Sequence, residues 1–347
     1  MTQALAMRHL LVEAGHEVVG AAIGKSDRRE VPGFFLDKIG TQVTRFLSPN
    51  FVTDEQNKGI LVGASIWKNL LKTERYLKSL SVLKEVVESA RPDLVINFYE
   101  PLWGLYQKLN AGQVDSVCVG HQFLVGHPDF PFPKGHAREK AMLQALNSVA
   151  AAGSRKRLGL SFTPLPQPEN TRLVVVPPLL RPELPDLART DGDYLLVYVM
   201  QAGYGQDIIN WHERHPEVRI HCFWDRRGAA EVERYNENLT FHQLSDVKFL
   251  EMMAGCRGLV TTAGFESVCE AMYLGKPVFM VPVAGHYEQA CNALDAARAG
   301  AGIWSTEFDL GVFVEYLPRH RSDYASFRAW TDRAAEMILT AISPRSG

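Results

Sequence analysis

The stretch that decides the fold is residues 255–302, which read GCRGLVTTAGFESVCEAMYLGKPVFMVPVAGHYEQACNALDAARAGAG. Residues 258–262 are apolar and β-branched, as is typical of a strand buried in a parallel sheet. They end at Ala263 and Gly264, where a helical pattern begins. A second apolar run, residues 278–281, follows this helix after Gly275 and a proline that stops it. The stretch therefore predicts a strand, a turn, a helix and another buried strand.

The turn at Gly264 is suited to a diphosphate. Glycine lets a ligand approach the backbone, and the first N–H groups of the following helix and its dipole favour an anion. Ser267 in the first helical turn adds a hydroxyl donor. A carboxylate beside a diphosphate would be repelled, so Glu270, one turn deeper than Glu266, suits neutral ribose hydroxyls better. Ala263, Gly264, Ser267 and Glu270 are thus predicted to bind a nucleotide-sugar donor.

A second polar group follows the carboxyl end of the strand at residues 278–281. The next helix opens near Gly285, and Glu288, Gln289 and Asn292 recur on one face near its amino end, with His286 just before them. Carboxylate and amide groups suit sugar hydroxyls. These four side chains also belong to the predicted donor-binding set.

Each of these residues also has a simpler explanation. Glu266 could only complement a helix dipole, Glu270 could face water, and Gly264 could be an ordinary turn glycine. Together the simpler explanations are weaker, because the polar groups cluster after the carboxyl ends of successive strands, where open α/β sheets bind ligands.

Length, composition and charge limit the classes of protein to which the chain can belong. The chain has 347 residues, 46% hydrophobic and 22% charged, which is enough for two domains with sizeable cores. A net charge of −2 gives no electrostatic footprint for nucleic acid, which is not an expected partner. No apolar run of about eighteen residues offers a transmembrane span.

The cysteines and acidic pairs offer no metal site. The five cysteines are odd in number, widely spaced and mostly within apolar runs, which is typical of reduced core residues in a cytoplasmic protein. Asp191 and Asp193 flank a glycine in the D-x-D form that some sugar transferases use for a metal, but turn formation explains this pattern more simply. We expect no metal and no cofactor.

The first half opens on a helical pattern, residues 2–14, followed by a strand at 16–23. A parallel α/β domain normally opens on a buried strand, so the first domain is expected to lack its first strand. Residues 24–30 form a polar, partly basic loop, for which solvation is a simpler explanation than contact with an acidic ligand. A strand at 42–46 and an amphipathic helix over 66–90 follow.

Two ionisable groups end neighbouring strands of the first half. Glu100 follows the strand at 94–98, and His121 follows the apolar segment 114–119. Catalysis or acceptor binding is predicted for both, with His127 and Asp129 as weaker candidates. A surface salt bridge would explain Glu100, and a satisfied polar contact would explain His121, at least as readily.

A stiff, proline-rich stretch, residues 177–185, is expected to be an exposed linker. A second α/β pattern begins with a strand at 194–200 and the turn 201–205, whose Gly203 and Gly205 could present amides to the same ligand. The last helix, 324–342, could pack back across the first domain. The predicted domains are 1–182 on the acceptor side, 183–320 for the nucleotide-sugar, and the helix within 321–347.

With these residues in place, the second half resembles the donor-binding domain of GT-B glycosyltransferases of the peptidoglycan N-acetylglucosaminyltransferase type, which is similar to glycosyltransferase family 28. The resemblance is strongest over residues 203–302. It rests on the following residues: Ala263-Gly264, Ser267, Glu270, Gly275, Pro277, Pro282, Glu288-Gln289 and Asn292-Ala293. It is weaker in the first half, where residues 2–6 and 13–18 match.

The resemblance implies two Rossmann-like domains facing across a cleft. It implies that Gly264 and Ser267 meet the diphosphate, that Glu270 meets the ribose, and that Glu288 and Gln289 meet the transferred sugar. The expected activity is an inverting, metal-independent transfer of a hexose-type sugar from a UDP-sugar to a glycan, lipid or small-molecule acceptor, with peripheral membrane contact left open. Alternatives are a nucleotide-sugar-binding protein without transfer activity and a sugar-nucleotide epimerase or hydrolase.

Overall fold

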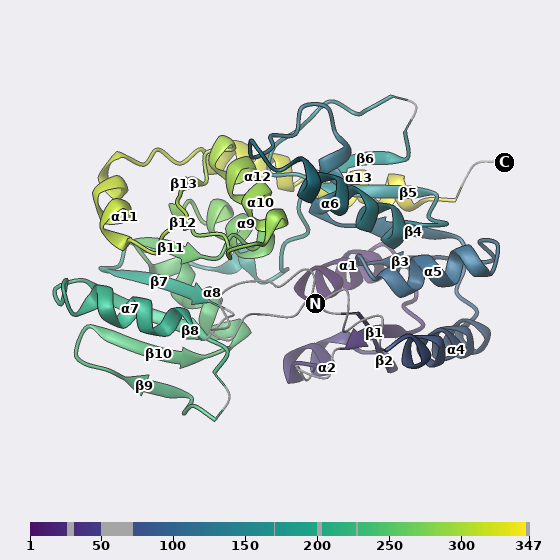
Figure 1. The fold of residues 1–347 in the computed structure, drawn as a ribbon, viewed down its shortest axis with the longest axis horizontal. Coiled ribbons are helices and arrows are strands. Elements are labelled where there is room, and N and C mark those ends of the chain that lie inside the picture. The colour runs from purple at the N-terminus through teal and green to yellow at the C-terminus, as the bar shows by residue number, and fades with distance from the viewer. Residues whose placement is uncertain (26–30, 50–71, 170, 200–202, 227, 345–347) are drawn as a thin grey trace.

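Two parallel α/β units follow one another along the chain (Figure 1). The computed structural model describes residues 1–25, 31–49, 72–169, 171–199, 203–226 and 228–344. Within these residues, the first half holds a two-stranded sheet and a four-stranded sheet, and the second half holds a seven-stranded sheet. The predicted α/β class is confirmed.

The first half contains short strands and the helices that connect them: α1 (Thr2–Glu13), β1 (Ala21–Lys25), α2 (Gly33–Ile39), β2 (Val43–Leu47), α4 (Thr73–Ala90), β3 (Val95–Asn97), α5 (Pro101–Leu109), β4 (Ser116–Val119), η1 (His121–Gly126), α6 (Ala137–Ala150), β5 (Lys156–Leu160) and β6 (Leu173–Val176). Strand β1 pairs with β2, and β3, β4, β5 and β6 pair in order, all in parallel. Whether the first domain lacks a strand stays a prediction.

Two boundaries in the first half differ from the predictions. The strand predicted at 16–23 begins at Ala21, because its pairing with β2 begins with Ala21 opposite Val43. The helix predicted over 66–90 is described from Thr73 onward, and the rest of it lies outside the described residues. The same is true of most of the polar loop at 24–30.

The second half has the following elements: η2 (Leu184–Asp186), β7 (Tyr194–Val199), α7 (Tyr204–His212), β8 (Arg219–Trp224), β9 (Val232–Arg234), β10 (Leu239–Gln243), α8 (Asp246–Gly255), β11 (Gly258–Thr261), α9 (Phe265–Tyr273), β12 (Val278–Met280), α10 (Tyr287–Arg298), β13 (Gly302–Trp304), α11 (Leu310–Tyr316), η3 (Leu317–Arg319), α12 (Tyr324–Thr331) and α13 (Ala334–Ile342). The strand order is β13-β12-β11-β7-β8-β10-β9, and among these described strands only β9 runs antiparallel to its neighbour.

This strand order places a ligand site. From β7 the chain adds strands outward in one direction, and from β11 it adds them in the other, so β7 and β11 lie side by side where the order reverses. Open α/β sheets bind ligands outside the carboxyl ends of the strands at such a reversal. The segments that follow Val199 and Thr261 are therefore the expected binding turns.

The two halves share apolar packing. One buried cluster combines Val119 and Leu160 of the first half with Cys269 and Met280 of the second. Burial of this kind contributes roughly 25 cal/mol per Å² of apolar surface. The cluster therefore stabilises both the contact between the halves and the interior of each half.

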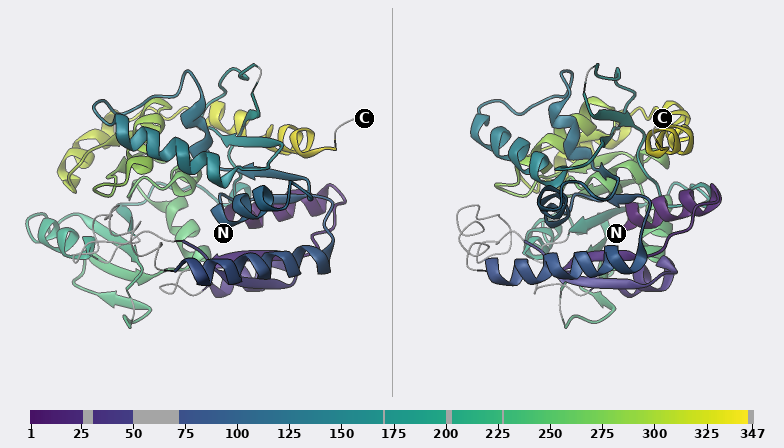
Figure 2. Two further views of the ribbon diagram at one scale, coloured as in Figure 1. Left: turned by 45° about the vertical axis from the view of Figure 1, so that its right-hand side comes forward. Right: turned by 90° about the vertical axis from the view of Figure 1, so that its right-hand side faces the viewer.

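The predicted final helix over 324–342 is wrong in one respect, because it is two helices. α12 contacts α9 of the second half, whereas α13 contacts β5 and β6 of the first (Figures 1 and 2). The chain bends at Asp332 and Arg333 because the two helices pack on different halves.

The stretch 177–185 is not the exposed linker that its prolines suggested. Leu179 and Leu184 are buried in the shared apolar cluster, and Arg181 is buried beside α9. Pro177 and Pro178 are buried as well, so prolines did not make this stretch exposed.

Candidate active site

Two strand-to-helix turns, one in each half, have the same backbone form. After β11 come Thr262, then Ala263 with φ of 59°, then Gly264 as the N-cap of α9. After β3 come Phe98, then Tyr99 with φ of 60°, then Glu100 as the N-cap of α5. A left-handed conformation at a non-glycine residue costs about 1–3 kcal/mol and is concentrated at functional sites. Both halves therefore aim a helix amino end in the same manner.

The N-cap residue of α9 is Gly264, which has no side chain to cap the helix. Gly264 has an ordinary φ of −68° and makes no side-chain cap hydrogen bond. A Cβ atom added at Gly264 would meet, among the described residues, only Ser267 Oγ, at 3.8 Å. The glycine is thus required neither by its φ nor by packing of the described residues, and those residues leave room beside it for a ligand. The first N–H groups of α9 and its dipole suit an anion there.

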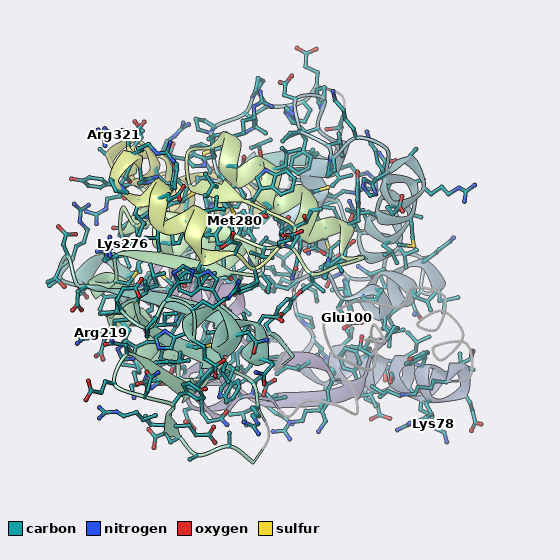
Figure 3. All side chains as sticks on the ribbon, turned by 60° about the vertical axis from the view of Figure 1, so that its left-hand side comes forward. Lys78, Glu100, Arg219, Lys276, Met280 and Arg321 are labelled. Carbon is teal, nitrogen blue, oxygen red and sulfur yellow. The ribbon has the colours of Figure 1, made fainter. Side chains whose placement is uncertain are left out.

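The amino end of α5 is filled by its own carboxylate. Glu100 Oε1 accepts a hydrogen bond from Leu102 N at 3.0 Å, and Ser48 Oγ donates to both carboxylate oxygens at 2.8 Å. Burial raises the pKa of Glu100, and the bonds from Leu102 and Ser48 oppose that rise. Glu100 lies well inside the outline of the molecule in a view where Lys78 and Arg321 lie at its edge (Figure 3). The predicted surface salt bridge is wrong, because its partners among the described residues are an amide and a hydroxyl.

Ser267 and Asn292 hold the turn before α9. Ser267 Oγ donates to Gly264 O at 3.3 Å, and Asn292 Nδ2 donates to Ala263 O at 3.2 Å. Both side chains are buried. They join α9 and α10 at the left-handed residue, which explains how its backbone strain is maintained.

The loop before α10 is held by two other predicted residues. Gln289 Oε1 accepts from Val283 N at 2.9 Å, and His286, the N-cap of α10, accepts through Nδ1 from Gln289 N at 3.4 Å. Glu288 lies on the same helix, and its Oε1 accepts from Gln122 Nε2 of the first half at 3.0 Å. Burial raises the pKa of Glu288, while His286 and Gln122 lower it.

Glu270 is engaged inside the protein. Arg181 donates from Nε to Oε1 at 2.6 Å and from Nη2 to Oε2 at 2.7 Å, and Glu270 is only 3% exposed. The expectation that it could face water is wrong. Burial raises the pKa of Glu270, and Arg181 lowers it.

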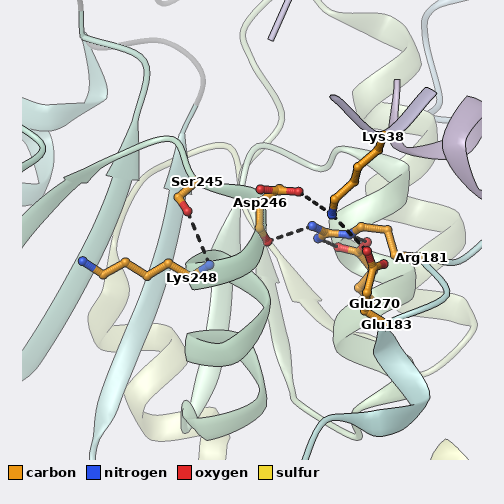
Figure 4. A network of polar contacts seen from close by, with 7 residues as sticks. All are labelled: Lys38, Arg181, Glu183, Ser245, Asp246, Lys248 and Glu270. Carbon is orange, nitrogen blue, oxygen red and sulfur yellow. Dashed lines mark hydrogen bonds and ion pairs between the residues drawn. The ribbon is translucent and has the colours of Figure 1, made fainter. Parts of the chain in front are cut away.

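Arg181 also belongs to a network that crosses between the halves (Figure 4). Its Nη1 donates to Asp246 O at 3.0 Å. Lys38 of α2 donates to Glu183 and to the Asp246 carboxylate, both at 2.9 Å. Thr2 at the start of α1 makes a further contact, donating to Glu266 of α9. The amino ends of α8 and α9 are therefore tied to the first half.

His121 is enclosed rather than open to an acceptor. Its Nδ1 is 2.6 Å from Leu160 O, and its ring stacks on Phe265, the first residue of α9, with centroids 4.3 Å apart. Its Nε2 is buried, has no hydrogen-bond partner among the described residues, and lies 3.7 Å from Asp295 Oδ2 of α10. Burial lowers the pKa of His121 to about 4 and raises that of Asp295 to about 6. This geometry favours the predicted polar contact over a base that touches the acceptor.

The two predicted glycine turns are neighbours. Tyr198 of β7 pairs with Thr261 of β11, and Gly203 is the N-cap of α7, which follows β7. Residues 201 and 202 lie outside the described residues. A Cβ at Gly205 would come within 2.6 Å of the Trp224 ring, so close packing of α7 on β8 explains this glycine.

The remaining expectations concern metals and membranes. Asp191 lies 3.6 Å from Lys276 Nζ, and Asp193 lies 3.1 Å from Arg219 Nη1. Across the described part of the chain, no group of three or more His, Cys, Asp or Glu side chains is placed to hold a metal ion. No helix among the described residues is long and apolar enough to cross a membrane.

Three residues that the sequence analysis did not select contact the predicted site: Gln122, Arg181 and Asp295. Their partners are far away in the sequence, 166 positions for Gln122 and 89 for Arg181, so no local pattern marks these residues. The N-cap role of Glu100 could have been predicted from the sequence, because Pro101 follows it and proline is favoured at the first position of a helix.

The fold and the paired turns define a two-domain α/β protein of the GT-B type. The model of the family described as "Glycosyl transferase family 1" matches residues 5–319, so the chain belongs to this family and is a glycosyltransferase. This confirms the resemblance to GT-B glycosyltransferases. No curated protein matches the sequence.

Solved structures support the same fold. The glycotransferase of kitacinnamycin superposes with a TM-score of 0.60 at 16% identity, covering 98% of this chain and 95% of that one. Arabidopsis thaliana UGT89C1, complexed with UDP-L-rhamnose, gives 0.59 at 15% identity and covers 97% and 91%. Acinetobacter baumannii MurG gives 0.53 at 15% identity and covers 98% and 94%.

Proposed function

We propose that this glycosyltransferase transfers a hexose-type sugar from a UDP-sugar to a hydroxyl acceptor with inversion of configuration. The observation that carries the proposal is the uncapped amino end of α9 at Gly264, beside the reversal between β7 and β11. The UDP-L-rhamnose bound to UGT89C1, a structure with the same fold, supports a UDP-linked donor.

In the proposed complex, the diphosphate binds at the amides of Gly264 and the first turn of α9, with Ser267 beside it. Glu270 stays paired with Arg181 and accepts from the ribose hydroxyls with the lone pairs that the ion pair leaves free, and Glu288 with Gln289 contacts the transferred sugar. Gly203 and the start of α7 face the same diphosphate. Negative charge grows on the diphosphate as it departs, and the helix amides and dipole stabilise that charge without a metal ion.

The first half supplies the base. The acceptor oxygen forms a bond to the anomeric carbon while the bond from that carbon to the diphosphate oxygen breaks, and its electron pair leaves with UDP. The acceptor proton passes to the carboxylate of Glu100. Burial raises the pKa of Glu100, which strengthens its carboxylate as a proton acceptor. Attack opposite to the leaving diphosphate inverts the anomeric centre.

The acceptor is proposed only as a glycan, lipid or small molecule with a free hydroxyl. The five cysteines are all buried and free, which supports a reducing compartment and hence the cytoplasm.

The test is release of UDP from UDP-sugars, measured with and without a library of hydroxyl acceptors. Acceptor-dependent release together with a glycosylated product of inverted configuration supports the proposal. Release of sugar into water without an acceptor would indicate a hydrolase instead. Tight UDP-sugar binding with no release under any condition would indicate a binding protein.

A further inference from the structure

Gln122 of the first half reaches the donor side. It lies on η1, directly after His121, yet its Nε2 donates to Glu288 Oε1 of α10 at 3.0 Å. Glu288 is the acid that the proposed function assigns to the transferred sugar. A side chain from the acceptor domain thus occupies one oxygen of a donor-binding carboxylate.

Gln122 is held at its backbone as well as at its side-chain amide. Its backbone carbonyl accepts from Asn147 Nδ2 at 2.7 Å, and Asn147 Oδ1 accepts from Tyr99 OH at 2.5 Å. A Cβ added at Gly120 would lie 2.6 Å from Gln122 Oε1, so the amide rests directly over the glycine backbone. The amide is therefore oriented before a ligand arrives, which lowers the entropic cost of a contact.

The chain of hydrogen bonds starts beside Glu100. Tyr99 is the left-handed residue that precedes Glu100, and the chain runs from Tyr99 through Asn147 and Gln122 to Glu288. It connects the turn of the proposed base with the carboxylate of the proposed sugar subsite. The position of Gln122 therefore depends on the turn at Tyr99, through Asn147, and on the carboxylate of Glu288.

The amide of Gln122 and the carboxylate of Glu288 can together recognise hydroxyl groups by hydrogen bonding. An amide carries two donors and a carbonyl acceptor, and Glu288 takes one of those donors. The second N–H and the carbonyl of Gln122, and the other oxygen of Glu288, can pair with hydroxyls on adjacent carbons. A sugar without a hydroxyl there would cover these polar groups and leave them unpaired, which discriminates strongly between substrates.

We propose that Gln122 is a specificity-determining residue for the transferred sugar, reading its hydroxyls jointly with Glu288. This inference rests on the proposed function, since it assumes that Glu288 faces the sugar of a UDP-sugar. It adds an element from the first domain to a donor site otherwise built from the second.

The test compares UDP, UDP-glucose and UDP-galactose by calorimetry in wild type, Gln122→Ala and a control, Gln144→Ala. Gln144 has an exposed position on α6. We expect Gln122→Ala to leave UDP affinity within about twofold and to reduce the preference between the two UDP-sugars by about tenfold, since a lost hydroxyl contact costs this much. Gln144→Ala should match wild type.

A variant of similar size and shape distinguishes a specific role of Gln122 from a general loss of structure. Gln122→Glu places a second carboxyl group about 3 Å from Glu288. The two groups share a proton at acidic pH, and their repulsion raises the pKa at which this last proton is lost, so both are ionised and repel each other only at higher pH. UDP-sugar binding should therefore be weak near about pH 8 and recover toward about pH 5, whereas UDP binding should not follow this trend. A purely structural role would not give this sugar-specific pH dependence.

The outcomes separate the two proposals. If wild type binds UDP but Gln122→Ala keeps the full sugar preference and Gln122→Glu shows no sugar-specific pH dependence, the inference about Gln122 is overturned and the proposed function stands. If wild type binds neither UDP nor either UDP-sugar, the proposed function fails and the inference falls with it.

Discussion

Arg181 and Glu270 form a two-pronged ion pair in the interior, with N–O distances of 2.6 and 2.7 Å. The pair fastens the segment between the two halves to α9, the helix whose amino end is the proposed diphosphate site. Since both groups are buried, their mutual attraction offsets a large desolvation cost. The nucleotide site and the connection between the halves therefore share one electrostatic contact.

The first prediction concerns the stability of this pair. Arg181→Met leaves the Glu270 carboxylate buried without its partner and should destabilise the protein by about 3–5 kcal/mol. The combined Arg181→Met and Glu270→Met variant removes both charges and should recover most of this loss. Thermal and urea unfolding measure the effect. Equal destabilisation by the single and double variants would contradict the pairing.

The second prediction tests whether Glu270 contacts the ribose. The double Met variant lacks the carboxylate but retains a packed site, so its UDP affinity should fall by about tenfold, as for a lost hydrogen bond to a hydroxyl. Affinity for 2′-deoxy-UDP should fall less, because one ribose hydroxyl is already missing. Calorimetry on both nucleotides decides the matter, and an equal loss for both would count against contact with the 2′-hydroxyl.

The third prediction concerns Glu100. Glu100→Gln keeps an oxygen that can accept from Leu102 N, so α5 should stay capped, but it removes the base. We expect the turnover rate to fall by about 10²–10⁴-fold with little change in KM for the donor. In wild type, activity should rise with pH through the raised pKa of Glu100, because only the ionised carboxylate accepts the proton. A variant with normal turnover would remove Glu100 from the mechanism.

The fourth prediction concerns His121 and Asp295. Folding lowers the pKa of His121 from 6.5 to about 4, so its contribution to stability is present above about pH 6.5 and is lost as pH falls toward 4. Folding raises the pKa of Asp295 from 3.8 to about 6, so its contribution is present below 3.8 and is lost as pH rises through 6. Between about pH 4 and 6 the two trends oppose each other.

Variants should separate these two trends. Asp295→Asn should make stability fall more steeply on acidification, by at most about 1.4 kcal/mol per pH unit for one proton. His121→Gln should instead flatten or reverse the fall. Thermal unfolding between about pH 4 and 7 measures both slopes, and identical slopes in both variants and wild type would contradict the assigned pKa shifts.

Local sequence patterns predicted the strands and turns of the second half well. The β-branched run before Ala263 and the helical pattern after Gly264 correspond to β11 and α9. These features are local, because strand propensity, a turn and a helix start all lie within a dozen residues. Gly203 lies beside the turn at Gly264 because β7 and β11 are neighbours in the sheet. The alternation of strands and helices along the sequence predicts a strand order of this kind.

Contacts between distant segments could not be predicted in this way. Arg181 is 89 positions from Glu270, and Gln122 is 166 positions from Glu288. The sequence around Arg181 or Gln122 does not indicate which distant residue each of them contacts. The bend between α12 and α13 was missed for the same reason, since it depends on which half each helix packs against.

The central claim is that the open amino end of α9 binds the diphosphate, and one substitution tests it directly. Gly264→Asp should cap α9 as Glu100 caps α5, because Gly264 has an extended conformation and the added Cβ meets only Ser267 Oγ, at 3.8 Å. Gly33→Asp, at the exposed first residue of α2, adds the same charge elsewhere. The measurement is UDP affinity by calorimetry, with thermal unfolding as the check on folding. We predict that Gly264→Asp folds with undiminished stability and loses UDP affinity by at least about 100-fold through repulsion of the diphosphate, while Gly33→Asp binds UDP as wild type does. Undiminished UDP affinity in a folded Gly264→Asp protein would contradict the account.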